Sequence, residues 1–182
     1  MRTDKYSTPT KVIHWLTAVL VLVAFIYGPG GSEQRVYSAA RDFDRQLHES
    51  LGLCILALVV ARVLWRPFDR RPEFRAVPRW MKVAADAVQA ALYVLLFALP
   101  LTAISGAWLE GHPLTLLGPL AIRSPLTESH ALGATIAEVH TWLGDLIMWL
   151  AGVHAGAALL HHYVLKDHVL RSMLPHRSSG NG

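Results

Sequence analysis

Four apolar segments, each long enough to cross a lipid bilayer as a helix, dominate the sequence. They cover about residues 12–29, 47–65, 81–109 and 134–165. A helix needs about 20 residues to cross about 30 Å of hydrocarbon, and each segment reaches that length with modest flanks. Only 16% of the residues are charged, against about a quarter in soluble domains. We therefore predict an all-α integral membrane protein, with residues 1–182 forming one domain built as a four-transmembrane-helix bundle.

The segments between these helices are polar or rich in proline. The stretch "RPFDRRPEFRAVPR" at residues 66–79 is rich in Arg and Pro, so it cannot continue a helix. Residues 110–133 contain three prolines and are expected to form an irregular loop, with room for a short surface helix. Pro100 predicts a kink or local break in the third helix. Residues 166–182 are predicted to form a polar tail.

The basic residues predict how the helices cross the membrane. With the amino terminus inside, 13 of the 17 Lys and Arg residues fall on the cytoplasmic side and 4 on the other. Cytoplasmic loops carry such an excess of positive charge. Both termini are therefore expected to be cytoplasmic. The net charge of +4 raises the question of nucleic acid, but the basic residues flank apolar runs, so membrane lipid is the predicted partner and nucleic acid is not.

Four histidines fall at two matching depths in this bundle. His140 and His154 are fourteen residues apart on the last helix. This spacing is a rise of about 21 Å and falls about 40° short of four full turns, so both rings lie on one face. The expected topology puts His14 level with His154 and His48 level with His140. Two facing imidazoles can fill both axial positions of a haem iron, and helix bundles build cofactor sites from facing side chains.

Other interpretations of the histidines stay open. They could be buried rings bonded to backbone carbonyls or to one another, or they could bind metal in a transporter. Ionisable residues inside a membrane are rare and usually functional, which favours a cofactor. A transporter usually has acidic residues at the midplane, and Asp145 is the clear candidate in the last segment. The single cysteine, Cys54, excludes covalent c-type haem attachment, which requires Cys-x-x-Cys-His.

Four stretches around these histidines carry a family resemblance. They read "KVIHWL", "QLHESLG", "EVHTWLG" and "GVHAGAALLHHYVLKDHVLRSMLP". They resemble the bacterial cytochrome b561 family over nearly the whole chain, and are most similar to the branch described as superoxide oxidase. The closing stretch, with its His-His-Tyr, Lys-Asp and late Met-x-Pro, is the most specific part.

The resemblance implies a di-haem cytochrome of the bacterial inner membrane. His14 and His154 would bind the iron of an inner haem b, and His48 and His140 that of an outer one. Both haems would be non-covalent. Superoxide would give its electron at the outer haem. Ubiquinone would be reduced near the inner face, close to His161.

Two functions compete on this basis. The first is a superoxide:ubiquinone oxidoreductase, for which no catalytic residue is assigned because electron transfer does not require superoxide to bind iron. The second is a cytochrome b subunit that links a dehydrogenase partner to the quinone pool. The sequence does not specify that protein partner.

Several other residues have two interpretations each. His161 either hydrogen-bonds a quinone and passes it a proton, as imidazoles can near neutral pH, or anchors the helix at the headgroups. Arg62 either pairs with a haem propionate or extends to the cytoplasmic surface. Arg41 and Arg45 either attract anionic superoxide or belong to a neutral, solvated loop with Asp42, Asp44 and Glu49. His162 is expected at the membrane interface, and solvated roles are expected for His112, His130, His168 and His176.

Overall fold

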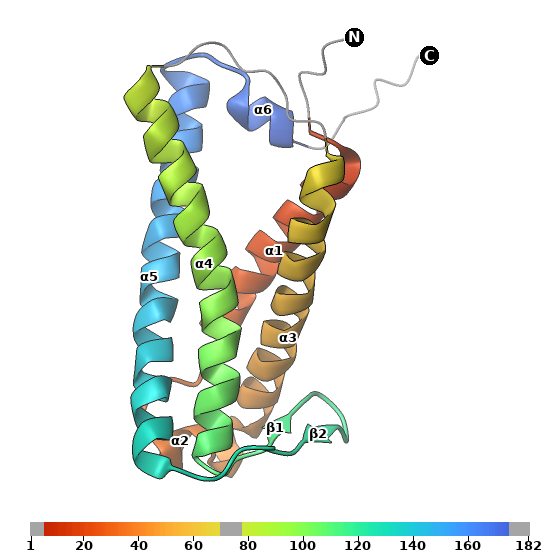
Figure 1. Cartoon of the computed structure of the whole chain (residues 1–182), viewed down its shortest axis with the longest axis vertical. Helices are drawn as coiled ribbons and strands as arrows, with labels where there is room; N and C mark the ends of the chain where they lie inside the picture. Colours follow the sequence, from red (N-terminus) through yellow and green to blue (C-terminus); the bar gives the residue numbers. More distant parts are fainter. Residues whose placement is uncertain (1–5, 70–77, 175–182) are drawn as a thin grey trace.

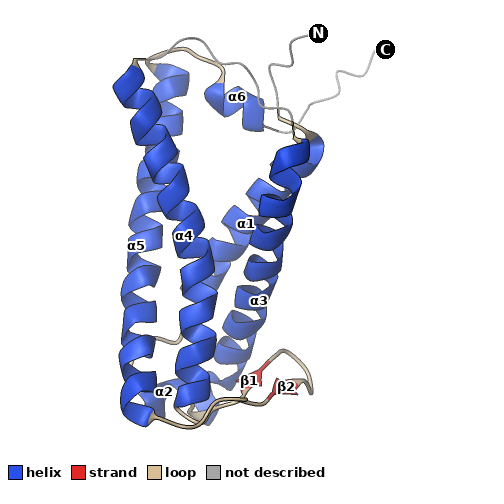
Figure 2. Ribbon diagram, viewed as in Figure 1, coloured by secondary structure: helices blue, strands red, loops and turns tan. Residues whose placement is uncertain are grey.

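The computed structural model describes residues 6–69 and 78–174. Four long helices run along the long axis of the molecule (Figures 1 and 2). They are α1 (Thr8–Ile26), α3 (Asp42–Trp65), α4 (Arg79–Leu109) and α5 (His130–Tyr163). Their most apolar 18-residue windows have mean hydropathies of 1.6 to 2.0, and each helix is long enough to cross a membrane. The predicted all-α bundle of four membrane-length helices is therefore confirmed.

The helices begin and end at local sequence signals rather than at the edges of the apolar segments. α1 begins at Thr8, four residues before the apolar segment, and Pro9 occupies its first turn, where a missing N–H costs nothing. It ends at Ile26, just before the Gly-Pro-Gly-Gly stretch. α5 begins at His130 rather than at 134, and it ends at Tyr163. α4 runs unbroken through the buried Pro100, so the expected local break does not occur.

Short elements close the two ends of the bundle. At one end lie α2 (Glu33–Val36), a 3₁₀ turn (Ala39–Arg41), and the antiparallel strands β1 (Leu114–Thr115) and β2 (Ala121–Ile122). A second 3₁₀ turn (Arg66–Phe68) follows α3 at the opposite end, where α6 (Val169–Met173) also lies. We call these the hairpin end and the α6 end.

Two of the connecting segments differ from the sequence predictions. The loop at residues 110–133 contains a two-stranded hairpin and no surface helix before α5 begins. The polar tail forms α6 within its described part, while residues 175–182 lie outside the described residues. Much of the arginine-rich link also lies outside them, at residues 70–77.

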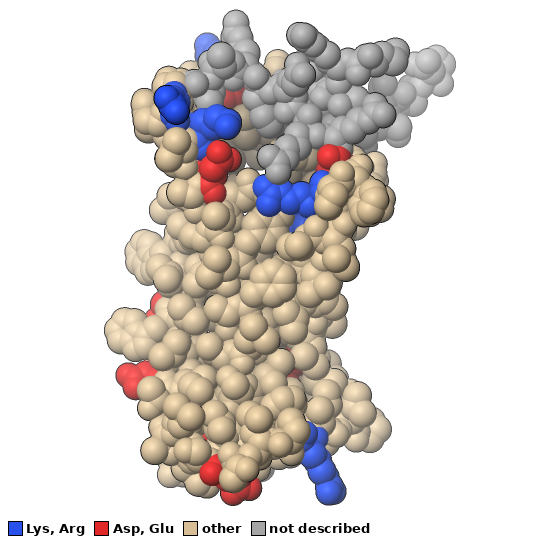
Figure 3. Space-filling view, in the orientation of Figure 1, with Lys and Arg blue, Asp and Glu red and all other residues tan. Residues whose placement is uncertain are grey.

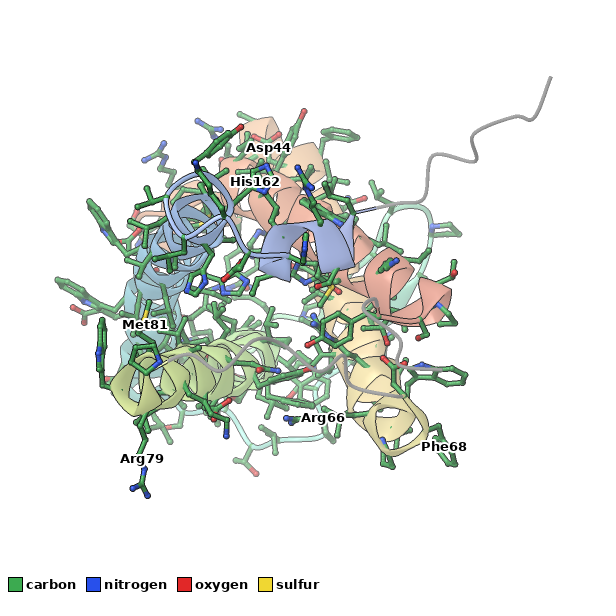
Figure 4. The ribbon with its side chains drawn as sticks, turned by 90° about the horizontal axis from the view of Figure 1, so that it is seen from above. Asp44, Arg66, Phe68, Arg79, Met81 and His162 are labelled. Carbon is green, nitrogen blue, oxygen red and sulfur yellow. The ribbon has the colours of Figure 1, made fainter. Side chains whose placement is uncertain are left out.

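The helices surround a shared interior. Seen along the bundle, they stand at four corners, and the side chain of Arg79 points away from them (Figure 4). α1 packs against α3, where Ala24, Ile55 and Val59 form a buried cluster. α4 packs against α5. On the face shown in Figure 3, Lys and Arg side chains lie near the ends, and the band between them is free of basic residues.

Two glycines allow α4 and α5 to approach closely at the hairpin end. A Cβ atom on Gly133 would lie 2.7 Å from Cγ of Glu110 and 2.8 Å from its backbone nitrogen. A Cβ atom on Gly106 would lie 3.3 Å from the backbone nitrogen of Ala137. Small residues at such contacts let helix backbones pack in a membrane, where van der Waals contact drives association.

Candidate functional site

At the hairpin end, His48 of α3 faces His140 of α5. Their ring centroids are 6.0 Å apart, and the ring planes are nearly perpendicular at 89°. Nδ1 of His48 lies 2.7 Å from the carbonyl oxygen of Ala24 in α1. Nδ1 of His140 lies 2.9 Å from the carbonyl oxygen of Leu99 in α4. A carbonyl only accepts hydrogen bonds, so both Nδ1 atoms donate and both Nε2 atoms keep a free lone pair.

At the α6 end, His14 of α1 faces His154 of α5. Their ring centroids are 6.4 Å apart, with an interplanar angle of 75°. Nη1 of Arg62 lies 3.3 Å from Nδ1 of His14. The indole ring of Trp15 lies edge-on to His14, with centroids 5.5 Å apart. The four histidines therefore form two facing pairs, one toward each end of the bundle.

The spacing within each pair fits one metal ion between the rings. Imidazole nitrogens bind metals at about 2.0–2.1 Å, so two imidazoles on opposite sides of one ion have centroids roughly 6 to 6.5 Å apart. Both observed distances, 6.0 and 6.4 Å, lie in this range. Among the described residues no group of three or more His, Cys, Asp or Glu side chains could hold a bare ion. Two protein ligands suit a porphyrin, whose own ring supplies the remaining iron ligands.

A mostly apolar pocket surrounds the hairpin-end pair. The pocket is partly open to solvent, and the rings of His48 and His140 line it. Gly52 and Gly144, each four residues after one of these histidines, also line it, and a Cβ on either would meet nothing within 4 Å. Apolar walls with few polar groups are typical of cofactor pockets. The lining therefore fits a large, flat, apolar group held by two imidazoles.

Arg62 points toward the α6-end pair. Its guanidinium lies over the ring of Tyr93, 5.4 Å from the centroid, and beside His14. Arg66 lies over the same ring at 5.9 Å. No Asp or Glu of the described residues forms an ion pair with Arg62 or Arg66. Of the two predicted roles for Arg62, the structure favours the one in which it faces a group inside the bundle.

Arg41 and Arg45 at the hairpin end pair with carboxylates. Arg45 is 8% exposed; it pairs with Asp42 at 2.6 Å and with Glu49 at 3.3 Å, and it donates to Thr115. Arg41 pairs with Asp44 at 2.9 Å. Of the two predicted interpretations of Arg41 and Arg45, these ion pairs favour charge compensation over the attraction of superoxide. The residues expected in a loop lie instead in a 3₁₀ turn and the first turns of α3. They are not fully solvated, because Glu49 also accepts a hydrogen bond from the backbone of Thr115 at 2.5 Å.

His112 is the loop histidine whose environment differs most from the sequence prediction. Its ring stacks on Tyr37 with centroids 3.5 Å apart, and its Nε2 lies 2.8 Å from Oε1 of Glu33. Burial, followed by the charge of Glu49, raises the pKa of the Tyr37 hydroxyl. Sequence reasoning missed this contact, because Glu33 and His112 are 79 residues apart and no periodic pattern connects them.

The α6 end contains a second polar contact that the sequence did not reveal. Nδ1 of His161 lies 2.5 Å from Oδ2 of Asp167, and both side chains are largely buried. His162, predicted at the interface, packs its ring against Tyr163 at 4.8 Å, and its buried Nδ1 has no hydrogen-bond partner among the described residues. His161 and Asp167 therefore form a pair of their own beyond His154.

These features define a class of protein: a helical bundle long enough to cross a membrane, with facing histidines in its interior, as in membrane-bound b-type cytochromes. The family model described as prokaryotic cytochrome b561 matches residues 5–176. The chain belongs to this family. It is therefore a bacterial membrane protein that transfers electrons with b-type haem.

Individual relatives align along almost the whole chain. "Cytochrome b561 homolog 2" of Escherichia coli is 29% identical over 98% of this chain and 96% of its own length. "Probable superoxide oxidase CybB" of Yersinia pestis is 33% identical over 94% of this chain and 96% of its own. "Cytochrome b562" of Cereibacter sphaeroides is 33% identical over 93% and 94%. The resemblance predicted from the histidine-containing stretches is thus confirmed at the level of the family.

Proposed function

We propose that this protein is a di-haem superoxide:ubiquinone oxidoreductase. One observation carries the proposal: two histidine pairs, at 6.0 and 6.4 Å, lie toward opposite ends of a membrane-length bundle. His48 and His140 would bind one haem b, and His14 and His154 a second. The name of the Yersinia relative supports the substrate, since it refers to superoxide oxidase.

The polar contacts of the histidines suit this assignment. Metal-binding histidines usually donate their second ring N–H to a carbonyl or carboxylate, as His48 and His140 do. At the α6 end, iron bound at Nε2 of His14 would put a hydrogen on its Nδ1. Arg62, which can only donate, would then turn from that atom toward an anion such as a haem propionate.

The pairs would let electrons cross the membrane. Each haem supplies an iron that accepts and releases one electron. Because two histidines would hold each haem, superoxide would not need to bind the iron to give up its electron. His140 and His154 are about 21 Å apart along α5, at 1.5 Å per residue. Two superoxide ions would give two electrons and leave as dioxygen, and one ubiquinone would take two electrons and two protons to become ubiquinol.

The proposed orientation follows the charge bias of the sequence. Most Lys and Arg residues belong to the side with the α6 end, which the positive-inside rule places in the cytoplasm. The hairpin end would then face the periplasm and meet superoxide. Quinone would be reduced near His161 at the cytoplasmic face of the inner membrane, and residues 1–182 would form one domain.

The test is a stopped-flow experiment on the purified, haem-loaded protein. We expect the haem absorbance to show reduction after a pulse of superoxide, and reoxidation after ubiquinone-1 is added. Superoxide dismutase added beforehand is the control and should abolish the reduction. If the haem stays oxidised after the pulse, the superoxide reaction is excluded. Reduction by a dehydrogenase partner would then be the function to measure.

A further inference from the structure

The chain reverses direction directly after α5 and brings one carboxylate back onto the helix. Lys166 adopts a left-handed conformation with φ of 51°. The backbone N–H of Asp167 then donates to the carbonyl oxygen of His161 at 3.1 Å. The side chain of Asp167 meets the ring of the same histidine, with Oδ2 2.5 Å from Nδ1. His161 and Asp167 are therefore held together by backbone and side chain at once.

The same carboxylate fixes the next element. Oδ1 of Asp167 accepts the backbone N–H of Val169 at 3.1 Å, at the start of α6. α6 is anchored in turn to α1, because Nε1 of Trp15 donates to the carbonyl oxygen of Met173 at 2.9 Å. Ser172 between them is 1% exposed. Asp167 thus lies just before α6, which lies at this end of the bundle (Figure 1), and each of its carboxylate oxygens accepts a hydrogen bond.

The contact with Asp167 determines which nitrogen of His161 is free to react. A carboxylate accepts hydrogen bonds, so Nδ1 of His161 carries hydrogen and donates. No described residue forms a hydrogen bond with Nε2 of His161. Nε2 therefore remains open to a ligand, as an acceptor in the neutral ring and as a donor in the imidazolium. A neighbouring carboxylate also stabilises the imidazolium that forms during proton transfer.

We propose that Asp167 is a positioning residue for quinone reduction, orienting His161 so that Nε2 gives a proton to a quinone carbonyl oxygen. The inference rests on the proposed function, in which quinone is reduced at this end. When the quinone has taken two electrons, the imidazolium of His161 gives its Nε2 proton to the nearer quinone oxygen and becomes the neutral, Nδ1-protonated ring. The second oxygen takes one proton (H⁺) from the bulk solvent at the same face, and a further solvent proton restores the imidazolium.

The first experiment compares variants of the haem-loaded protein by rapid mixing with ubiquinone-1. Asp167→Asn keeps a side-chain oxygen that can accept the N–H of Val169 but removes the negative charge. We expect it to retain haem and α6 but to reoxidise its reduced haem about tenfold more slowly or worse, chiefly in kcat rather than KM. Asp167→Glu, which keeps a carboxylate, should recover part of the rate. Asp86→Asn is the matched control, because Asp86 is exposed on α4 and, among residues 6–69 and 78–174, forms an ion pair with Lys82 alone, at 3.8 Å.

A second measurement tests the orientation without using activity. In ¹⁵N-histidine-labelled protein, the His161 signals are identified by their loss in His161→Gln. We expect neutral His161 to carry its hydrogen on Nδ1 in the wild type and to lose this preference in Asp167→Asn. An Nε2-protonated tautomer in the wild type would overturn the inference, as would an Asp167→Asn variant that reoxidises as fast as Asp86→Asn. A wild type that fails to reduce ubiquinone-1 would instead refute the proposed function, together with the proton transfer to quinone, while the tautomer would still report whether Asp167 orients the ring.

Discussion

At the scale of single residues, the hydrogen bonds of each imidazole distinguish the candidate ligands from the other histidines. His48 and His140 each use Nδ1 on a backbone carbonyl from a neighbouring helix. These bonds tie the ring orientation to the packing of all four long helices. A hydrogen bond at Nδ1 fixes the ring orientation and leaves Nε2 available to a ligand. His162 has no such bond among the described residues.

Removing one ligand should empty one site only. His140 faces His48 and lies fourteen residues along α5 from His154, which belongs to the other pair. We therefore expect His140→Ala to lose the haem at its own site only, which is about half of the haem b per chain. Haem would be measured as pyridine haemochrome against protein concentration. His162→Ala, a change on the same helix outside both pairs, should keep the wild-type haem content. Full haem content in purified His140→Ala would show that His140 is not an axial ligand.

The sequence reveals the histidine pairs but not the polar partners around them. His140 and His154 are fourteen residues apart, so helical geometry alone puts both rings on one face of α5. In the structure each ring faces a histidine of another helix. Asp167 escapes this reasoning because it lies beyond the helix, where periodicity ends and the left-handed Lys166 sets the chain direction. The ion pairs of Arg45 within its own helix match its spacing to Asp42 and Glu49, but its burial depends on the distant Thr115.

At the scale of elements, hydropathy locates the four helices and local signals set their ends. The apolar segments predict which residues lie in hydrocarbon. They do not predict the hairpin of β1 and β2, since strands of two residues carry no alternating pattern. The hairpin is instead held by tertiary bonds, such as Leu117 N–H to the hydroxyl of Ser50 at 2.9 Å. Tertiary contacts of this kind are not visible in a single sequence.

The contact between α4 and α5 should depend on Gly133. A methyl group there would press on the backbone of Glu110, at 2.8 Å from its nitrogen, so the helices must shift apart. We expect Gly133→Ala to destabilise the fold by about 1–3 kcal/mol, the usual cost of overpacking. Thermal unfolding in detergent would show a lower Tm. Gly156→Ala is the matched control on the same helix, because its Cβ would meet nothing within 4 Å; equal Tm values for the two variants would contradict a tight contact at Gly133.

At the scale of the whole molecule, the two histidine pairs divide the bundle into two functional ends. The pair near the hairpin is enclosed by apolar residues and by a neutralised polar network. The pair near α6 lies beside Arg62, and both Arg62 and Arg66 lie over the ring of Tyr93. Neither arginine has a carboxylate partner within the described part of the chain. Because the two environments differ in charge, we expect the two proposed haem sites to differ in reduction potential and in the redox partner that each meets.

The number of haem b groups per chain tests the central claim most directly. It is measured on the purified wild-type protein by a reduced-minus-oxidised optical spectrum together with pyridine haemochrome quantitation. Two facing pairs of imidazoles predict two non-covalent haem b groups per chain, both with the spectrum of low-spin, histidine-ligated iron. A protein prepared with an ample supply of haem that contains one haem per chain, or none, would contradict the account.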